Sequence, residues 1–201
     1  ADDTVVAYSS DHGDNVGARG LWGKSNMYEE SVAVPLLMAH PDLPPATCET
    51  PVSLVDLAAT IPDCFGLAGE PGMVGESLAD IAKRDTDPDR AVFSEYHAAG
   101  AVTGAFMIRK GRHKLIHYHG FGDELFDLEA DPEELVNLIA DNRYKVVLED
   151  LWSELRAVCD PKEVERKAHA DQRAMVDALG GLEAVRNLGP KGATPPPAAV
   201  G

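Results

Sequence analysis

The feature that most constrains the fold is an apolar, β-branched run at residues 4–9, Thr-Val-Val-Ala-Tyr-Ser. A short run of this kind is typical of a strand that is buried on both faces within a parallel sheet. Such a strand needs a neighbour on each side, and the three residues before it cannot supply one. We therefore expect this chain to be part of a larger α/β sheet that begins before Ala1.

Two polar residues, Asp11 and His12, follow this strand, and Lys24 comes twelve residues after His12. In α/β sheets, ligands bind beyond the carboxyl ends of the strands. A carboxylate and an imidazole can both bind a divalent cation, and an ammonium suits an oxygen of a tetrahedral oxyanion. The alternative is an ordinary Asx turn followed by a solvated loop lysine. The segment between His12 and Lys24 contains four glycines, Gly13, Gly17, Gly20 and Gly23.

The run Ser9-Ser10-Asp11-His12-Gly13, then Gly20-Leu21-Trp22-Gly23-Lys24 and Tyr28-Glu29-Glu30, resembles the sulfatases. These are formylglycine-dependent esterases of the alkaline phosphatase superfamily. His12 stands where many of them have asparagine, so the chain looks most like the group with choline sulfatases and phosphonate monoester hydrolases. The resemblance implies that Asp11 and His12 are metal ligands and that Lys24 contacts the ester group.

The resemblance extends over most of residues 4–160 in the family's order. In that family the Asp-His motif lies past the middle of the chain, so we expect this chain to be a carboxy-terminal portion. The further matching segments are Val52–Leu57, Gly75–Leu78, Glu95-Tyr96, Met107–Gly111, Lys114–Ile116, Glu124–Leu128, Asp131–Glu134 and Asn137-Leu138.

The family's nucleophile is absent from these residues. It is a formylglycine made from the first residue of a Cys/Ser-x-Pro-x-Arg motif, and Cys48, Cys64 and Cys159 do not lie in one. The resemblance implies that the formylglycine and further acidic metal ligands lie in a missing amino-terminal part. It also implies one divalent metal ion, Ca²⁺ or Mn²⁺. We therefore expect the 201-residue chain alone to be inactive.

The resemblance implies the fold class α/β, as the carboxy-terminal part of an alkaline-phosphatase-like doubly wound sheet with a small antiparallel sheet and a helical tail. We expect the end of the α/β domain with the metal loop at 1–85, the small sheet at 86–140, a helical extension at 141–188 and a flexible Pro/Gly tail at 189–201. Residue patterns predict strands at 36–39, 91–96, 105–109 and 113–118, the last two forming a hairpin. They predict helices at 53–65, from Asp131, at 144–158 and at 161–179, with Pro62 kinking or ending the first early.

Charge and composition exclude several classes. A formal net charge of −16, from 34 acidic and 18 basic residues, argues against nucleic acid as a partner. No apolar run is long enough to span a bilayer. Three widely spaced cysteines make no disulfide framework. Localisation is left open between cytoplasm and periplasm.

Two side-chain patterns have competing explanations. His113, His117 and His119 alternate along one strand, which is compatible with zinc, but clustered surface histidines are commoner and we favour that reading. Glu95 could face a cationic choline group, but we favour a sheet-edge or ion-paired glutamate.

The function predicted is a metal-dependent sulfuric ester hydrolase acting on a small anionic ester, a sulfate monoester. The first rival is a hydrolase of phosphate or phosphonate esters with the same site, since both substrates are tetrahedral oxyanions. The second rival is a non-catalytic, truncated module. We expect the full enzyme to be a homo-oligomer in which the tail takes part.

Overall fold

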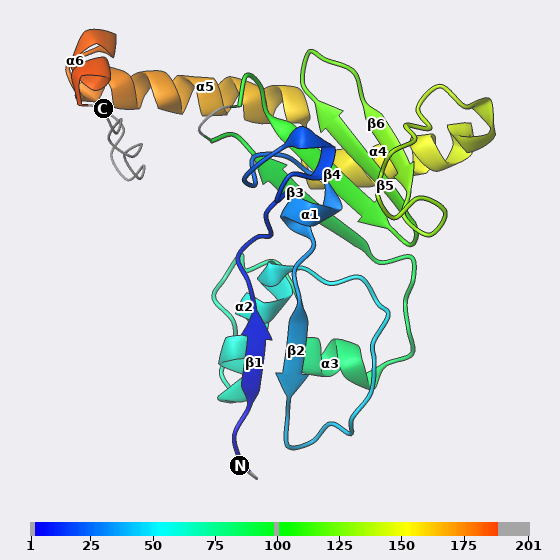
Figure 1. Ribbon diagram of the computed structural model, residues 1–201. Coiled ribbons are helices and arrows are strands. Elements are labelled where there is room, and N and C mark those ends of the chain that lie inside the picture. Colours follow the sequence, from blue (N-terminus) through cyan, green and yellow to red (C-terminus); the bar gives the residue numbers. More distant parts are fainter. Residues whose placement is uncertain (1–2, 99–100, 189–201) are drawn as a thin grey trace, which may run out of the picture. The chain divides into compact units, whose positions relative to one another are not determined.

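The computed structural model describes residues 3–98 and 101–188, and Figure 1 shows its elements. It forms two compact units, Ala1–Pro161 and Lys162–Gly201. The four finer ranges expected from the sequence stay a prediction. The elements are β1 (Val6–Ser9), η1 (Ala18–Gly20), α1 (Glu29–Val32), β2 (Leu36–Ala39), α2 (Leu54–Cys64), α3 (Leu78–Lys83), β3 (Ala91–Tyr96), β4 (Ala105–Lys110), β5 (His113–Tyr118), β6 (Glu124–Asp127), η2 (Asn142–Tyr144), α4 (Lys145–Val158), α5 (Pro161–Ala178) and α6 (Leu182–Asn187).

The first unit contains a four-stranded antiparallel sheet in the order β3-β4-β5-β6. The predicted hairpin is confirmed: β4 and β5 pair with Lys110 opposite His113, and the turn places Gly111 at a φ of 56°. β3 matches its predicted range, and β6 was not predicted as a strand. The mixed α/β class with a small antiparallel sheet is confirmed.

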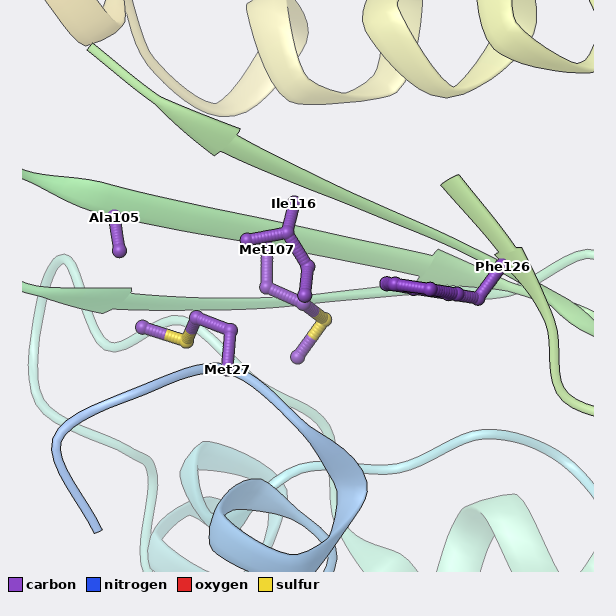
Figure 2. Close-up of a cluster of buried hydrophobic side chains, with 5 residues drawn as sticks. All are labelled: Met27, Ala105, Met107, Ile116 and Phe126. Carbon is purple, nitrogen blue, oxygen red and sulfur yellow. The ribbon is translucent and has the colours of Figure 1, made fainter. Parts of the chain in front are cut away.

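Each face of this sheet is covered by a different part of the chain. On one face, Met27 packs with Ala105, Met107, Ile116 and Phe126, as Figure 2 shows. Helix α4 lies on the opposite face, where alternation of the strands places Phe106, Ile108, Leu115 and Leu125 beside Leu151 and Leu155. Burying each large apolar side chain stabilises the fold by about 1.5–3 kcal/mol.

The prediction for residues 4–9 was wrong in two respects. β1 pairs antiparallel with β2, in the register Val6 opposite Ala39, and the two form a separate two-stranded sheet. Val6 is 59% exposed and Tyr8 65% exposed, so the strand is not buried. The chain between β1 and β2 doubles back, which makes the strands antiparallel. No third strand joins them within the described residues, and Val6, Tyr8 and Leu37 remain exposed while Leu36 and Met38 are half-buried.

Helix α2 forms where its capping residues predict. Ser53 accepts a hydrogen bond from Val55 N, and Asp56 Oδ2 accepts one from Ser53 N at 2.8 Å, which completes a capping box. The helix ends at Cys64, two residues after Pro62. Asp56 is fully buried and also accepts hydrogen bonds from Glu76 N and Arg90 Nη2, at 2.9 and 2.6 Å. It therefore links α2 to the segments before α3 and β3.

The helix predicted to begin at Asp131 is absent. Residues 131–138 form turns, with Glu134 at a φ of 51°. Asn137 Oδ1 accepts a hydrogen bond from Leu125 N at 3.0 Å, and Leu138 N donates to Leu125 O at 2.8 Å. These contacts tie the segment to the edge of β6, so tertiary contacts prevail over the local helix-start signal.

The remaining helices follow the sequence pattern. α4 begins at Lys145, one residue later than predicted, and buries Leu151 and Leu155. α5 ends one residue earlier than predicted, and α6 was not predicted. Within residues 3–98 and 101–188, no helix is both long and apolar enough to cross a membrane. The tail predicted at 189–201 lies outside the described residues.

Candidate functional site

The three residues singled out from the sequence come together. The carboxylate Oδ2 of Asp11 lies 3.3 Å from Nε2 of His12, and the ammonium of Lys24 contacts the same nitrogen. All three line one cleft of about 560 Å³, which β3 and β4 also border. The Asp11 side chain is 82% exposed and that of His12 37% exposed, so both are open to a ligand.

The hydrogen bonds of His12 indicate its tautomer. Nδ1 lies 2.7 Å from the carbonyl oxygen of Gly13, which can only accept, so we assign the ring proton to Nδ1. Nε2 then presents a lone pair toward Asp11 and Lys24. A backbone carbonyl bound to the far ring nitrogen is the arrangement that usually orients a metal-binding histidine.

The donor set therefore fits a divalent cation, but only in part. Two ligands about 90° apart, each ~2.3 Å from a cation, lie roughly 3.3 Å from each other. The Asp11–His12 separation agrees with that spacing. In the part of the chain that the structure describes, no group of three or more His, Cys, Asp or Glu residues could hold a metal ion. These two residues can thus supply part of a coordination shell and no more.

The loop before Lys24 is closed by hydrogen bonds to Gly23. Asp14 Oδ1 accepts from Val16 N at 2.9 Å and from Gly23 N at 3.2 Å. Asn15 donates to the carbonyl oxygen of Gly23 through its backbone N–H, at 2.8 Å, and through its side-chain amide. Both ends of the loop are therefore tied together next to Lys24.

The buried residue Ser31, in α1, contacts the backbone at both parts of the site. Its carbonyl oxygen accepts from Gly13 N at 2.8 Å, and its hydroxyl donates to the carbonyl oxygen of Lys24. A Cβ on Gly13 would lie only 2.1 Å from the carbonyl oxygen of Glu30. Position 13 thus requires glycine because α1 approaches so closely.

A buried ion cluster beneath α1 was missed by the sequence analysis. The Lys114 side chain is 0% exposed, and its ammonium lies 2.8 Å from Glu29 Oε1 and 2.8 Å from Glu134 Oε1. Glu134 Oε2 also accepts the backbone N–H of Glu29 at 2.7 Å. Burial raises the pKa of Glu134, against the opposing effect of Lys114. One signal was available: Lys114 is in phase with Ile116 on the strand, and a lysine on a core-facing position needs acidic partners.

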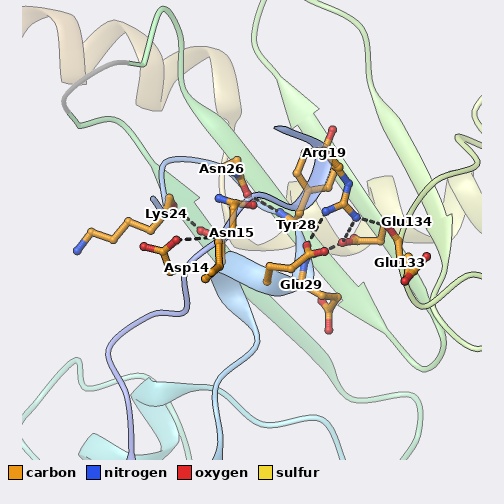
Figure 3. Close-up of polar contacts among 12 residues, drawn as sticks. Asp14, Asn15, Arg19, Lys24, Asn26, Tyr28, Glu29, Glu133 and Glu134 are labelled. Carbon is orange, nitrogen blue, oxygen red and sulfur yellow. Dashed lines mark hydrogen bonds and ion pairs between the residues drawn. The ribbon is translucent and has the colours of Figure 1, made fainter. Parts of the chain in front are cut away.

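Arg19, in η1, extends this cluster, as Figure 3 shows. Its Nη1 donates to Glu30 Oε2 at 2.6 Å, and its Nη2 lies 3.7 Å from Glu134 Oε2. Its guanidinium stacks 4.2 Å from the centre of the Tyr28 ring. The Tyr28 hydroxyl donates to Glu124, and burial together with that carboxylate raises the pKa of Tyr28 to about 12.

The other histidines have partners of their own. His117 Nδ1 lies 2.8 Å from Asp123 Oδ1, and its ring packs against Trp152. His113 Nε2 lies 3.9 Å from Asp127. Glu95 Oε2 lies 3.3 Å from Nε2 of His97.

Comparison with known proteins decides the family. A model of the N-sulphoglucosamine sulphohydrolase C-terminal family matches residues 17–161. The chain belongs to the sulfatase family. It is 40% identical to a choline-sulfatase of Rhizobium meliloti (strain 1021) over 71% of this chain and 28% of the relative. It is 33% identical to arylsulfatase K of Mus musculus over 83% of this chain and 32% of the relative. This sulfatase chain thus spans about a third of the length of these curated relatives.

Two solved structures are similar to this sulfatase chain. One, in complex with its substrate D-glucosamine-2-N,6-O-disulfate, has a TM-score of 0.69 at 28% identity, covering 85% of this chain and 35% of that one. The other, a phosphonate monoester hydrolase of Agrobacterium radiobacter, has a TM-score of 0.65 at 27% identity, covering 78% and 35%. The predicted resemblance to sulfatases and phosphonate monoester hydrolases is confirmed.

Proposed function

We propose that this chain supplies part of the metal site and an ester-oxygen contact of a sulfuric ester hydrolase. The observation that carries this proposal is the convergence of Asp11 Oδ2, His12 Nε2 and Lys24 Nζ in one cleft. The arrangement offers two metal donors of different chemistry and one cation within a small space. Membership of the sulfatase family supports the reaction class.

Asp11 and His12 would hold one divalent cation, with Ca²⁺ and Mn²⁺ as the candidates. A mixed oxygen and nitrogen donor pair is acceptable to both, and carboxylate is a preferred ligand of each. When bound, such a cation neutralises charge on the ester oxygens. The remaining acidic ligands and the formylglycine nucleophile would come from residues outside this chain.

Lys24 would donate from its ammonium to a non-bridging oxygen of the ester. Its position next to His12 keeps the ammonium within the cleft, and the loop bonds to Gly23 fix its backbone. As the bond to the leaving oxygen breaks, negative charge grows on the group being transferred. A donor already aimed at that group stabilises the transition state more than the ground state.

The substrate class proposed is a small sulfate monoester, and the names of the curated relatives support it. The second candidate is a phosphate or phosphonate ester, which the similarity to a phosphonate monoester hydrolase favours. The third is a module without catalytic activity. A net charge of −16 gives a nucleic-acid partner no support.

The experiment uses the full-length enzyme that carries this chain, and compares turnover of 4-nitrophenyl sulfate, 4-nitrophenyl phosphate and a 4-nitrophenyl phosphonate ester. We expect the sulfate to be the best substrate and the Asp11→Ala enzyme to lose bound metal and turnover together. A higher kcat/KM for the phosphorus esters would favour the second candidate. Absence of turnover with all three in metal-loaded enzyme would contradict the sulfatase proposal and favour a non-catalytic module.

A further inference from the structure

The buried ion cluster at Lys114 touches none of the residues proposed to bind metal or ester. The ammonium of Lys114 is fully buried and pairs with the carboxylates of Glu29 and Glu134, at 2.8 Å each. Burying a charge is unfavourable even when it is paired, and a well-packed apolar side chain would often serve stability as well. Stability alone is therefore a weak reason for this cluster.

The cluster joins three separate segments at one point. Lys114 lies on β5, Glu134 lies in the turn after β6, and Glu29 is the first residue of α1. Lys114 fixes the side chain of Glu29, while Glu134 Oε2 accepts the backbone N–H of Glu29 at 2.7 Å. Both the backbone and the side chain at the start of α1 are thus fixed to the sheet.

Ser31, two residues after Glu29, connects α1 to the candidate site. Ser31 is 2% exposed. Its carbonyl oxygen accepts a hydrogen bond from the N–H of Gly13, and its hydroxyl donates one to the carbonyl oxygen of Lys24. Gly13 follows His12 directly, and its carbonyl oxygen accepts from His12 Nδ1. A movement of α1 would therefore shift His12 and Lys24 together.

We propose that Lys114 and Glu134 are positioning residues for the candidate site, acting through α1. They fix α1 on the sheet, and α1 fixes the backbone at Gly13 and Lys24. The consequence for catalysis rests on the proposed function. The coupling of the Lys114 ion cluster to the backbone at Gly13 and Lys24, through α1, involves only residues of this chain.

The test measures amide hydrogen exchange in the full-length enzyme that carries this chain, by mass spectrometry with fragmentation to single residues. Lys114→Met removes the ammonium and retains most of the apolar stem. We expect the Gly13 amide, which bonds to Ser31 O, to exchange at least roughly tenfold faster, while the amides between β4 and β5 change by less than about twofold. Unchanged exchange at Gly13 in a folded Lys114→Met enzyme would overturn the proposal.

The matched control is Lys110→Met. Lys110 lies on the neighbouring strand β4 and also makes two ion pairs, at 2.9 Å with Asp150 and 2.7 Å with Glu154. Those partners belong to α4, on the sheet face away from α1. Gly13 exchange should match the wild type in this variant. Equal acceleration in both variants would mean general destabilisation and would overturn the proposal.

Glu134→Gln serves if Lys114→Met does not fold. The amide oxygen can still accept the N–H of Glu29, while the charge facing Lys114 is removed. We again expect selective acceleration at Gly13, and its absence would count against the proposal.

In the full-length enzyme, Glu134→Gln should lower kcat severalfold with metal content retained. A wild-type kcat in this variant would overturn the catalytic part of the proposal. Normal turnover in the Asp11→Ala enzyme would instead count against the proposed function. That outcome would not change what the exchange at Gly13 says about the role of Lys114 and Glu134.

Discussion

The hydroxyl of Ser31 donates a hydrogen bond to the backbone carbonyl of Lys24, seven residues earlier in the chain. The carbonyl of the same serine accepts the N–H of Gly13 at 2.8 Å. One buried residue therefore contacts the main chain on both sides of the candidate site, next to His12 and at Lys24.

Replacing Ser31 by alanine should weaken the loop. The Lys24 carbonyl would lose one of its two donors and keep the N–H of Asn26, at 2.9 Å. The loss of one such hydrogen bond costs about 0.5–1.5 kcal/mol. We expect the urea midpoint to fall and the Lys24 side-chain NMR signals to shift. The control is Ser25→Ala, whose exposed hydroxyl lies 3.0 Å from the Tyr96 hydroxyl. Equal stability of the two variants would contradict the assignment.

Lys24 and the two proposed metal ligands should differ in what their removal does to the full-length enzyme. Lys24→Ala should keep the metal and lose about 2–4 kcal/mol of transition-state stabilisation, the amount typical of a lost oxyanion donor. Asp11→Ala and His12→Ala should reduce metal content and kcat together. The measurements are metal analysis of the purified protein and kcat/KM on an aryl sulfate. Wild-type metal content and kinetics in all three variants would refute the site.

The 201-residue chain alone should not turn over an aryl sulfate, because no Cys/Ser-x-Pro-x-Arg motif occurs in it. Purified chain is assayed with a chromogenic sulfate ester beside the Asp11→Ala chain. Turnover by the first that the second lacks would show that these residues contain a nucleophile of their own.

We expect Asp127 to make the first unit sensitive to acid. Burial of Asp127 opposes its ionisation, but the Arg112 guanidinium at 2.6 Å and the backbone N–H groups of Glu129 and Ala130 outweigh it and lower the pKa of Asp127. A carboxylate with a lower pKa in the folded state stabilises the fold above its unfolded pKa, near 3.8, and that contribution is lost as pH falls through the folded pKa.

Arg112→Met should therefore move the midpoint of acid unfolding to higher pH, as followed by circular dichroism. Arg143→Met is the control. It breaks an Arg–Asp pair with Asp141 in which the arginine is 82% exposed, and exposed pairs contribute little. A larger shift in the control than in Arg112→Met would contradict this prediction.

The residues after Leu188 should contribute to subunit contacts in the full enzyme. This expectation comes from the resemblance to the choline sulfatase group. Deleting residues 189–201 should lower the mass seen by light scattering and leave metal content unchanged. An unchanged mass would mean that the segment has no part in assembly.

The parts of the fold that the sequence predicts well depend on neighbouring residues. The capping box of Ser53 and Asp56 lies within one turn of helix, and the β4–β5 hairpin depends on the link Lys110–Arg112. Both signals are local, so no distant contact was needed to read them.

The parts that were missed depend on distant partners. Glu134 lies in a turn and not in a helix, and its side chain is directed to Lys114, twenty residues earlier. The sequence order singled out Asp11, His12 and Lys24, and the structure brings these three side chains together. The role of Ser31 had no sequence signal, because any serine can donate to a backbone carbonyl. The antiparallel pairing of β1 depends on which strands are available to it.

The paired strands β1 and β2 have a practical consequence for work with the isolated chain. Both outer edges of this ribbon present unpaired backbone N–H and C=O groups within the described residues, and Val6, Tyr8 and Leu37 are 59–65% exposed. Edges of this kind recruit strands from other molecules and promote aggregation. The isolated chain should therefore self-associate by strand addition as its concentration rises. Its particle size would then report on these edges and not on the subunit arrangement of the enzyme.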